Sequence, residues 1–157
     1  MAEINTRCAV PADLKTLLRF EQGIISTERP FDPTLKEGKI SYYDLKGMIT
    51  AANVELAVAV ANDKIVGSGY ARIEDSKIYL KHAQHAYLGF MYVEPEYRGQ
   101  GVNQKIIEHF KQWAISRNVT ELRLEVYDEN LPAIKAYEKF GFSKLLVQMR
   151  MGINDQP

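Results

Sequence analysis

The sequence predicts an α/β (α+β) fold, with a mixed central sheet of about six or seven strands flanked by about four helices. Short runs of alternating apolar residues recur along the chain, and segments with apolar residues at helical spacing lie between them. The chain has 157 residues, of which 46% are hydrophobic, enough for one core that buries about 70% of the unfolded surface. Because it contains neither a linker nor an internal repeat, we expect residues 1–157 to form a single domain.

The first quarter of the chain predicts one strand and one helix before an irregular loop. Residues 4–10 alternate as a strand, and Pro11 and Asp13 then signal the start of a helix that runs to about Ile25. Two prolines and a glycine interrupt 26–38, which is therefore expected to be a loop or a broken helix.

A second helix and a hairpin are expected next. Ser41-Tyr-Tyr-Asp44 has the pattern of a capping box and predicts a helix that ends near Ala52. Residues 54–61 and 64–73 alternate as strands joined by the short polar turn Asn62-Asp63.

The second half of the chain alternates strands and helices. Strands are expected at 87–93 and 121–127 around a helix at 103–116, which implies a parallel pair with a ligand site beyond the carboxyl ends of the strands. A helix at 130–140, ended by a glycine, precedes a last strand at 142–151. The exposed edge of that strand is a candidate surface for a homodimer.

The segment Tyr97-Arg98-Gly99-Gln100-Gly101 connects a strand to a helix and has the character of an anion site. Two glycines at the start of a helix leave backbone N–H groups directed at one point, and Arg98 adds a cation. A dinucleotide motif would need a glycine at Gln104, and no Lys-Ser or Lys-Thr follows as in a P-loop. Taken alone, the glycines are equally consistent with a simple strand-to-helix turn.

Composition excludes several classes of protein. Twenty basic and twenty acidic residues balance, so we expect no nucleic acid partner, and without a membrane-length apolar segment or a signal pattern we expect a cytoplasmic location. A single cysteine, Cys8, excludes an internal disulfide and is expected to be a small buried strand residue. His82-x-x-His85 lies beside a strand with no cysteine nearby, so no metal site is expected.

Two motifs together resemble the GNAT superfamily of acetyl-CoA-dependent N-acetyltransferases. The first is Val93-Glu-Pro-Glu-Tyr-Arg-Gly-Gln-Gly101, and the second joins Leu122-Arg-Leu-Glu-Val126 to Ala133-Ile-Lys-Ala-Tyr137-Glu-Lys-Phe-Gly141-Phe142. The resemblance covers residues 87–142 most closely. It implies a GNAT fold in which the parallel strands 87–93 and 121–127 splay apart, and it implies acetyl-CoA as the acetyl donor.

The resemblance also assigns a cofactor site. The pantetheine arm is expected to lie along the backbone of strand 87–93, and Asn130 matches a cofactor-contacting position, although an Asn before a helix also suits an N-cap. Asn103 stands where the family usually has a small residue, which leaves the fine geometry of the phosphate site open. The cofactor-binding residues implied are Met91, Tyr92, Val93, Arg98, Gly99, Gln100, Gly101, Val102, Asn103, Asn130 and Tyr137.

For the chemistry, the resemblance implies direct attack of a primary amine on acetyl-CoA in a ternary complex. Tyr137 matches the family tyrosine that protonates the departing thiolate. Packing alone also explains an aromatic residue there. Glu125 is the best candidate for the base, directly or through a water, although a solvated or ion-paired Glu is common at this position.

The acceptor is expected to be a small-molecule amine. One alternative acceptor is the α-amine of a protein N-terminus, because the 121–142 segment resembles enzymes that acetylate such an amine. The other alternative is a non-catalytic acyl-CoA-binding module. Residues expected to contact the acceptor are Glu21, Glu28, Tyr42 and Tyr43.

Overall fold

The computed structural model describes residues 2–154, and within them the chain forms five strands and four α-helices. The mixed α/β class is confirmed, with five strands in place of six or seven. The chain has two compact units, residues 1–125 and residues 126–157. The elements are β1 (Ile4–Cys8), α1 (Leu14–Glu28), α2 (Leu45–Met48), β2 (Val54–Ala61), β3 (Lys64–Asp75), β4 (Gln84–Val93), α3 (Val102–Ser116), β5 (Leu122–Leu124) and α4 (Leu131–Phe140).

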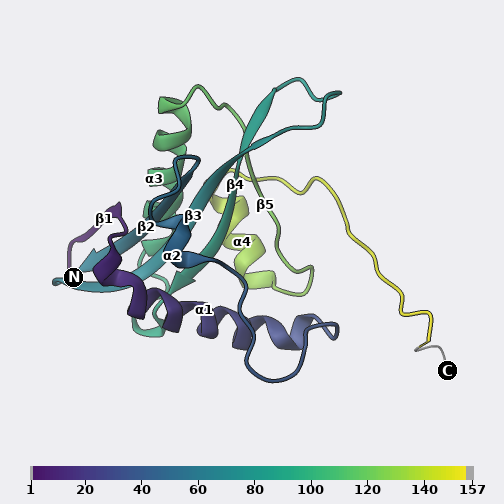
Figure 1. Cartoon of the computed structure of the whole chain (residues 1–157), viewed down its shortest axis with the longest axis horizontal. Helices are drawn as coiled ribbons and strands as arrows, with labels where there is room; N and C mark the ends of the chain where they lie inside the picture. The colour runs from purple at the N-terminus through teal and green to yellow at the C-terminus, as the bar shows by residue number, and fades with distance from the viewer. Residues whose placement is uncertain (1, 155–157) are drawn as a thin grey trace. The chain divides into compact units, whose positions relative to one another are not determined.

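The sheet lies in the first unit and has the strand order β1-β2-β3-β4-β5 (Figure 1). The pairs from β1 to β4 are antiparallel, whereas β4 and β5 run parallel because α3 connects them. The predicted hairpin turn is confirmed: Asn62 and Asp63 have φ values of 51° and 62°, the left-handed pair that matches the twist of a two-residue hairpin.

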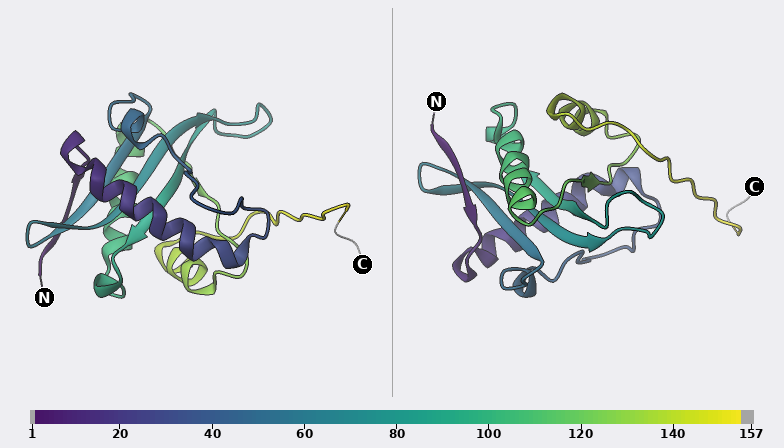
Figure 2. Two further views of the ribbon diagram at one scale, coloured as in Figure 1. Left: turned by 60° about the horizontal axis from the view of Figure 1, so that its bottom comes forward. Right: turned by 90° about the horizontal axis from the view of Figure 1, so that it is seen from above.

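Helices α1 and α3 cover opposite faces of this sheet (Figure 2). On one face, Leu17 and Phe20 of α1 belong to the same apolar cluster as Phe90 of β4. On the other face, α3 approaches β3 closely, since a Cβ at Gly69 would lie 2.9 Å from the Phe110 ring. Both faces of the central strands are therefore buried, which explains their nearly continuous apolar sequence.

The predicted helix at 41–52 is largely wrong, because α2 has only four residues. The Ser41 side chain does not cap a helix; its hydroxyl lies 3.3 Å from the carboxylate of Glu21. Asp44 is the N-cap instead and accepts a hydrogen bond of 3.1 Å from the Gly47 N–H. A contact with α1 has thus replaced the local capping pattern.

The second unit contains α4 and the segment after it. The C-terminus of α4 has a Schellman arrangement, in which Phe142 N–H donates to Tyr137 C=O at 3.0 Å and Gly141 has a φ of 131°. The expected strand at 142–151 is wrong, because this segment forms no strand in the part of the chain that the structure describes. A strand is stabilised by hydrogen bonds to a neighbour, and none of the described ladders includes these residues.

No helix among residues 2–154 combines the length and the apolar character that crossing a membrane requires.

Candidate functional site

The loop before α3 has the backbone that an anion site requires. Gly99 and Gly101 have φ values of 77° and 82°, so both lie in the left-handed region that other residues rarely adopt. Gly101 is the N-cap of α3, and no side-chain cap hydrogen bond is formed there. Apart from each glycine, its chain neighbours and the backbone of α3, no atom of the described residues lies within 4 Å of the position that a Cβ would take at either glycine. The start of α3 therefore presents backbone donors and the positive end of its dipole to open space.

A polar chain of contacts holds this loop on α1. Arg19 donates to both carboxylate oxygens of Glu94, at 3.1 and 3.2 Å, and the Tyr92 hydroxyl donates to Glu94 at 3.2 Å. Glu94 is only 5% exposed, and its hydrogen bonds with Arg19 lower the pKa of its carboxyl. Arg98 donates from Nε to the Val93 carbonyl at 3.0 Å, so its stem follows the end of β4. Glu94 thus stabilises the position of the loop.

Strand β4 separates from β5 at the middle of its length. Parallel pairing begins at Ala86 with Leu122 and ends at Leu88 with Leu124. Just beyond this point Phe90 has a φ of 57°, and the β3–β4 register shifts between Ser68 and Tyr70. A bulge of this kind bends a strand and increases its twist. Within the described residues, the backbone of 89–93 therefore has no β5 partner and offers an edge to an extended ligand.

Glu125 lies immediately after the last β4–β5 pair and is exposed. The Tyr87 hydroxyl donates to its Oε1 at 3.1 Å. Burial raises the pKa of Tyr87, and the Glu125 charge raises it further, so Tyr87 stays a neutral donor. The arrangement places an ionisable carboxylate, oriented by a phenol, at the start of the opening between the two strands.

An aromatic wall continues from Tyr87 toward the loop after α1. The Tyr87 and Tyr70 rings are 6.4 Å apart, and Tyr43 packs edge-on against Tyr70 at 5.6 Å. The guanidinium of Arg72 lies 5.4 Å from the Tyr70 ring centroid and 5.8 Å from that of Tyr87, and Glu74 pairs with it. The sequence predicted a contact role for Tyr43 but not for Tyr70, Tyr87 or Arg72. The sequence places these three residues on two strands, but it does not show that pairing of the strands brings them close to Glu125.

The other residues predicted to contact the acceptor differ in their environments. Glu21 is 1% exposed and accepts from the backbone N–H groups of Tyr42 and Tyr43 at 3.0 and 2.8 Å. These hydrogen bonds hold the 41–43 segment against α1, so the Glu21 carboxylate has a structural role. Burial raises the pKa of Glu28, an effect that a hydrogen bond with Tyr42 partly offsets. Glu28, Tyr42 and Tyr43 remain candidates.

Several residues predicted to bind the cofactor have side chains that contact other parts of the protein. Met91 packs on the α3 side of the sheet, where its sulfur would lie 2.7 Å from a Cβ at Gly69. Tyr92 packs on α1, and Gln100 donates to a backbone carbonyl of its own loop at 3.0 Å. Asn103 lies in the first turn of α3, one residue after Val102. Backbone groups are therefore what these positions offer to a ligand.

In the unit 126–157, Asn130 precedes α4 as its N-cap residue but forms no side-chain cap hydrogen bond. Tyr137 packs against Phe142 with ring centroids 5.9 Å apart. The Tyr137 ring thus has a packing role, and its catalytic role stays a prediction from the motif.

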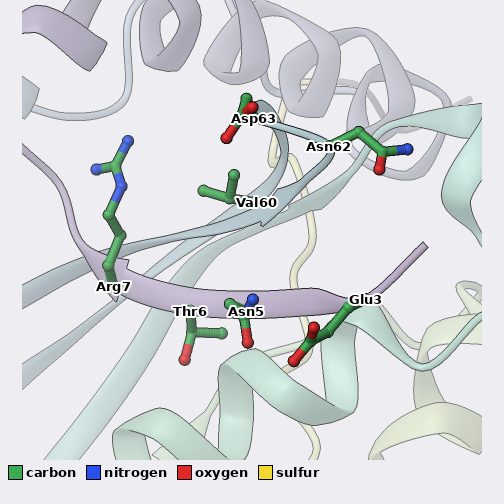
Figure 3. A pocket seen from close by; sticks show the side chains of 7 residues that line it. All are labelled: Glu3, Asn5, Thr6, Arg7, Val60, Asn62 and Asp63. Carbon is green, nitrogen blue, oxygen red and sulfur yellow. The ribbon is translucent and has the colours of Figure 1, made fainter.

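A separate shallow hollow lies between β1 and the β2–β3 turn (Figure 3). It contains none of the predicted site residues, and its lining consists of Glu3, Asn5, Thr6, Arg7, Val60, Asn62 and Asp63.

A left-handed glycine pair that opens a helix, next to a strand that parts from its parallel neighbour, is the arrangement expected for an acetyl-CoA-binding fold. The model of the acetyltransferase (GNAT) family matches residues 22–142. The chain belongs to this family.

Curated relatives match a shorter segment. A thialysine N-epsilon-acetyltransferase of Bos taurus is 40% identical over 62 residues, which is 40% of this chain and 36% of that protein. A streptothricin acetyltransferase of Escherichia coli is 43% identical over 51 residues, or 32% of this chain and 29% of that protein. The chain thus matches about a third of the length of these relatives.

Solved structures match the fold over nearly the whole chain. A predicted acetyltransferase from Clostridium acetobutylicum, solved with acetyl-CoA, covers 98% of this chain and 99% of its own, with a TM-score of 0.71 and 18% identity. At this identity the similarity shows the fold alone.

Proposed function

We propose that this protein transfers the acetyl group of acetyl-CoA to a primary amine of a small molecule. The observation that carries the proposal is the left-handed pair Gly99 and Gly101 at the start of α3, beside the β4 edge that β5 leaves unpaired. Membership of the GNAT family supports acetyl-CoA as the donor. The names of the two curated relatives, acetyltransferases of thialysine and of streptothricin, support a small amine as the acceptor.

In this proposal the backbone N–H groups of 99–103 bind the pyrophosphate of coenzyme A, and Arg98 contributes its charge, since its own backbone N–H donates to the Pro95 carbonyl. The guanidinium already lies near the end of β4, 5.8 Å from the Tyr92 ring centroid. The pantetheine arm adds to β4 as an extra strand along Met91 to Val93, because no β5 residue among the described residues pairs with this part of β4. Asn130, placed by motif, completes the cofactor contacts.

Glu125 acts as the base, directly or through a water, and the amine attacks the thioester carbonyl in a ternary complex. Removing the proton from a lysine-like amine of pKa about 10.4 at a pH of about 7 costs roughly 4.6 kcal/mol, so a carboxylate near the acceptor matters most for amines of this kind. The hydrogen bond from Tyr87 holds the Glu125 carboxylate at the strand opening. Tyr137, placed by motif, returns a proton to the sulfur of coenzyme A.

The wall of Tyr43, Tyr70 and Tyr87 supports an acceptor that carries a cationic amine next to an apolar stem. Aromatic faces attract a cation, and the nearby carboxylates of Glu125 and Glu28 add to the attraction. The guanidinium of Arg72 already lies against two of these rings, which illustrates their affinity for positive charge.

The test is a thiol-release assay with acetyl-CoA against a panel of acceptors: lysine analogues, streptothricin, an aminoglycoside and peptides with a free α-amine. We expect turnover with a small-molecule amine, and a loss of about 100-fold or more in Tyr137→Phe. Tyr79→Phe is the matched control, because Tyr79 is 74% exposed and outside the proposed site. Turnover with peptide α-amines alone would favour a protein N-terminal acetyltransferase instead.

Calorimetric titration with acetyl-CoA separates binding from turnover. A protein that binds the cofactor but releases no thiol with any acceptor would be a non-catalytic binding module. Absence of binding at millimolar acetyl-CoA would refute the proposed function altogether.

A further inference from the structure

Three side chains with metal-binding atoms meet on the α3 side of the sheet, and the acetyl-transfer proposal uses none of them. They are Cys8 at the end of β1, Glu55 in β2 and His109 in the middle of α3. The Cys8 sulfur lies 3.3 and 3.2 Å from the two carboxylate oxygens of Glu55, and His109 Nε2 lies 2.8 Å from Glu55 Oε2. All three ligand atoms lie within 4.8 Å of one another.

The fold explains why these residues converge. Successive residues of a strand point to opposite faces, and Figure 3 shows Thr6 and Arg7 on opposite sides of β1. Cys8 therefore points to the same side as Thr6, and that is the side of α3, because the Thr6 hydroxyl lies 3.0 Å from His109 Nδ1. Two paired strands and a central helical turn hold the three groups, so their positions do not depend on a mobile loop.

The distances agree with a tetrahedral zinc site. With zinc bonds of about 2.0 Å to nitrogen and oxygen and about 2.3 Å to sulfur, neighbouring ligands are about 3.3 to 3.5 Å apart. The sulfur–oxygen and nitrogen–oxygen distances of this cluster differ from those values by only a few tenths of an ångström. The sulfur and the imidazole nitrogen lie within 4.8 Å of each other, and binding of the ion requires side-chain movements that bring them to about 3.5 Å.

The second contact of the histidine matches the pattern of a metal ligand. When Nε2 binds a metal, Nδ1 must carry the proton and donate it, and the Thr6 hydroxyl is in place to accept it. Thr6 is thus a positioning residue that holds the imidazole with Nε2 directed at the proposed metal position.

We propose that Cys8, Glu55 and His109 form a binding site for a divalent transition metal ion of the zinc type. On binding, the Cys8 thiol releases its proton to solvent, and the thiolate and the Glu55 carboxylate together balance the two positive charges of the ion. A thiolate and an imidazole select zinc-like ions over magnesium or calcium, which prefer oxygen ligands. Three protein ligands leave a fourth position for water.

The ion has access from solvent. Cys8 is exposed, and a hollow between β1 and α3 is lined by Thr6, Glu55 and His109 together with Lys105 and Glu108. Because the ion would join β1, β2 and α3, its binding is expected to raise the melting temperature of the protein. The sequence predicted no metal site because these ligands are separated by 47 and 54 positions, with no motif spacing.

Cobalt binding to tag-free protein tests the proposal, with Co²⁺ as a spectroscopic probe for zinc. We expect a thiolate-to-cobalt charge-transfer band in the near ultraviolet that Zn²⁺ displaces. Cys8→Ser should abolish the band, and Thr6→Val should weaken binding by about tenfold or more. His109→Gln should weaken it at least as much, and at the same concentration Zn²⁺ should raise the melting temperature of the wild type more than that of these variants.

His85→Gln is the matched control, since the His85 imidazole also pairs with a glutamate, Glu74 at 3.3 Å, but has no cysteine beside it. Its cobalt spectrum should equal that of the wild type. Circular dichroism without metal establishes that each variant is folded. Because Cys8→Ser replaces an exposed side chain, we expect this variant to fold, and it tests the proposal even if His109→Gln does not fold. A wild type without a thiolate band, or a Cys8→Ser variant that binds Co²⁺ like the wild type, would overturn the proposal.

Discussion

Replacing Gly101 by alanine separates the backbone role of the α3 N-terminus from its role in binding acetyl-CoA. The φ of 82° at Gly101 is strained for any residue with a Cβ, at a cost of about 1–2 kcal/mol. Alanine also restricts the unfolded chain, which recovers about 0.4–1 kcal/mol. No clash adds to the balance, because nothing lies within 4 Å of the new methyl group. The free energy of unfolding should therefore fall by about 0–1.6 kcal/mol.

The effect on the cofactor should be larger. The methyl group occupies the open space into which the loop donors point, and displacing one charge-assisted hydrogen bond to a phosphate costs about 1.5–3 kcal/mol. We expect acetyl-CoA affinity, measured by calorimetric titration, to fall by about 10- to 100-fold. Urea unfolding of the same sample measures the stability.

Gly38 provides a matched control within the chain. Its φ is 81° and nothing lies within 4 Å of the position that a methyl group would take there, so Gly38→Ala has the same backbone strain and the same open surroundings. It should lose the same stability and keep its affinity for acetyl-CoA. If Gly101→Ala binds acetyl-CoA as tightly as Gly38→Ala does, the assignment of the loop as a phosphate site is wrong.

Three further predictions concern single carboxylates. Glu125→Gln should lower kcat by about 100-fold or more while acetyl-CoA affinity stays constant, and an unchanged rate in the thiol-release assay would remove Glu125 from the mechanism. Glu21→Gln should lower the free energy of unfolding in urea by about 2–4 kcal/mol, because the new amide group faces backbone N–H donors; a loss under about 0.5 kcal/mol would contradict the role inferred for Glu21. The pKa of Glu94 is lowered in the folded state, so its stabilisation is present above the unfolded pKa and is lost as the pH falls toward the folded pKa. Glu94→Gln should therefore be less stable than the wild type by about 1–2 kcal/mol at neutral pH, with a gap that closes in acid; a constant gap would refute the linkage.

Local patterns predicted most of the fold. Alternation identified β2 and β3, the Asn62-Asp63 turn, and the helical stripe of α3, because each depends on side chains only a few positions apart. The pattern failed at Ser41, where a capping sequence was overridden by a contact with Glu21, twenty positions earlier. The prediction failed again at 142–151, whose apolar residues suit a strand but whose hydrogen-bonding partner the sequence does not supply.

The same division holds for the candidate sites. By itself the sequence determined the glycine loop, its resemblance to a family and the candidates Glu125 and Tyr137, since these are contiguous motifs. Only the tertiary structure decided that Tyr87 donates to Glu125, that Phe90 bends β4 away from β5, and that Cys8 is exposed beside Glu55 and His109. Cys8 was expected to be buried, because its small apolar character is all that the sequence shows. Contacts between distant elements depend on sheet register and helix placement, which no local pattern encodes.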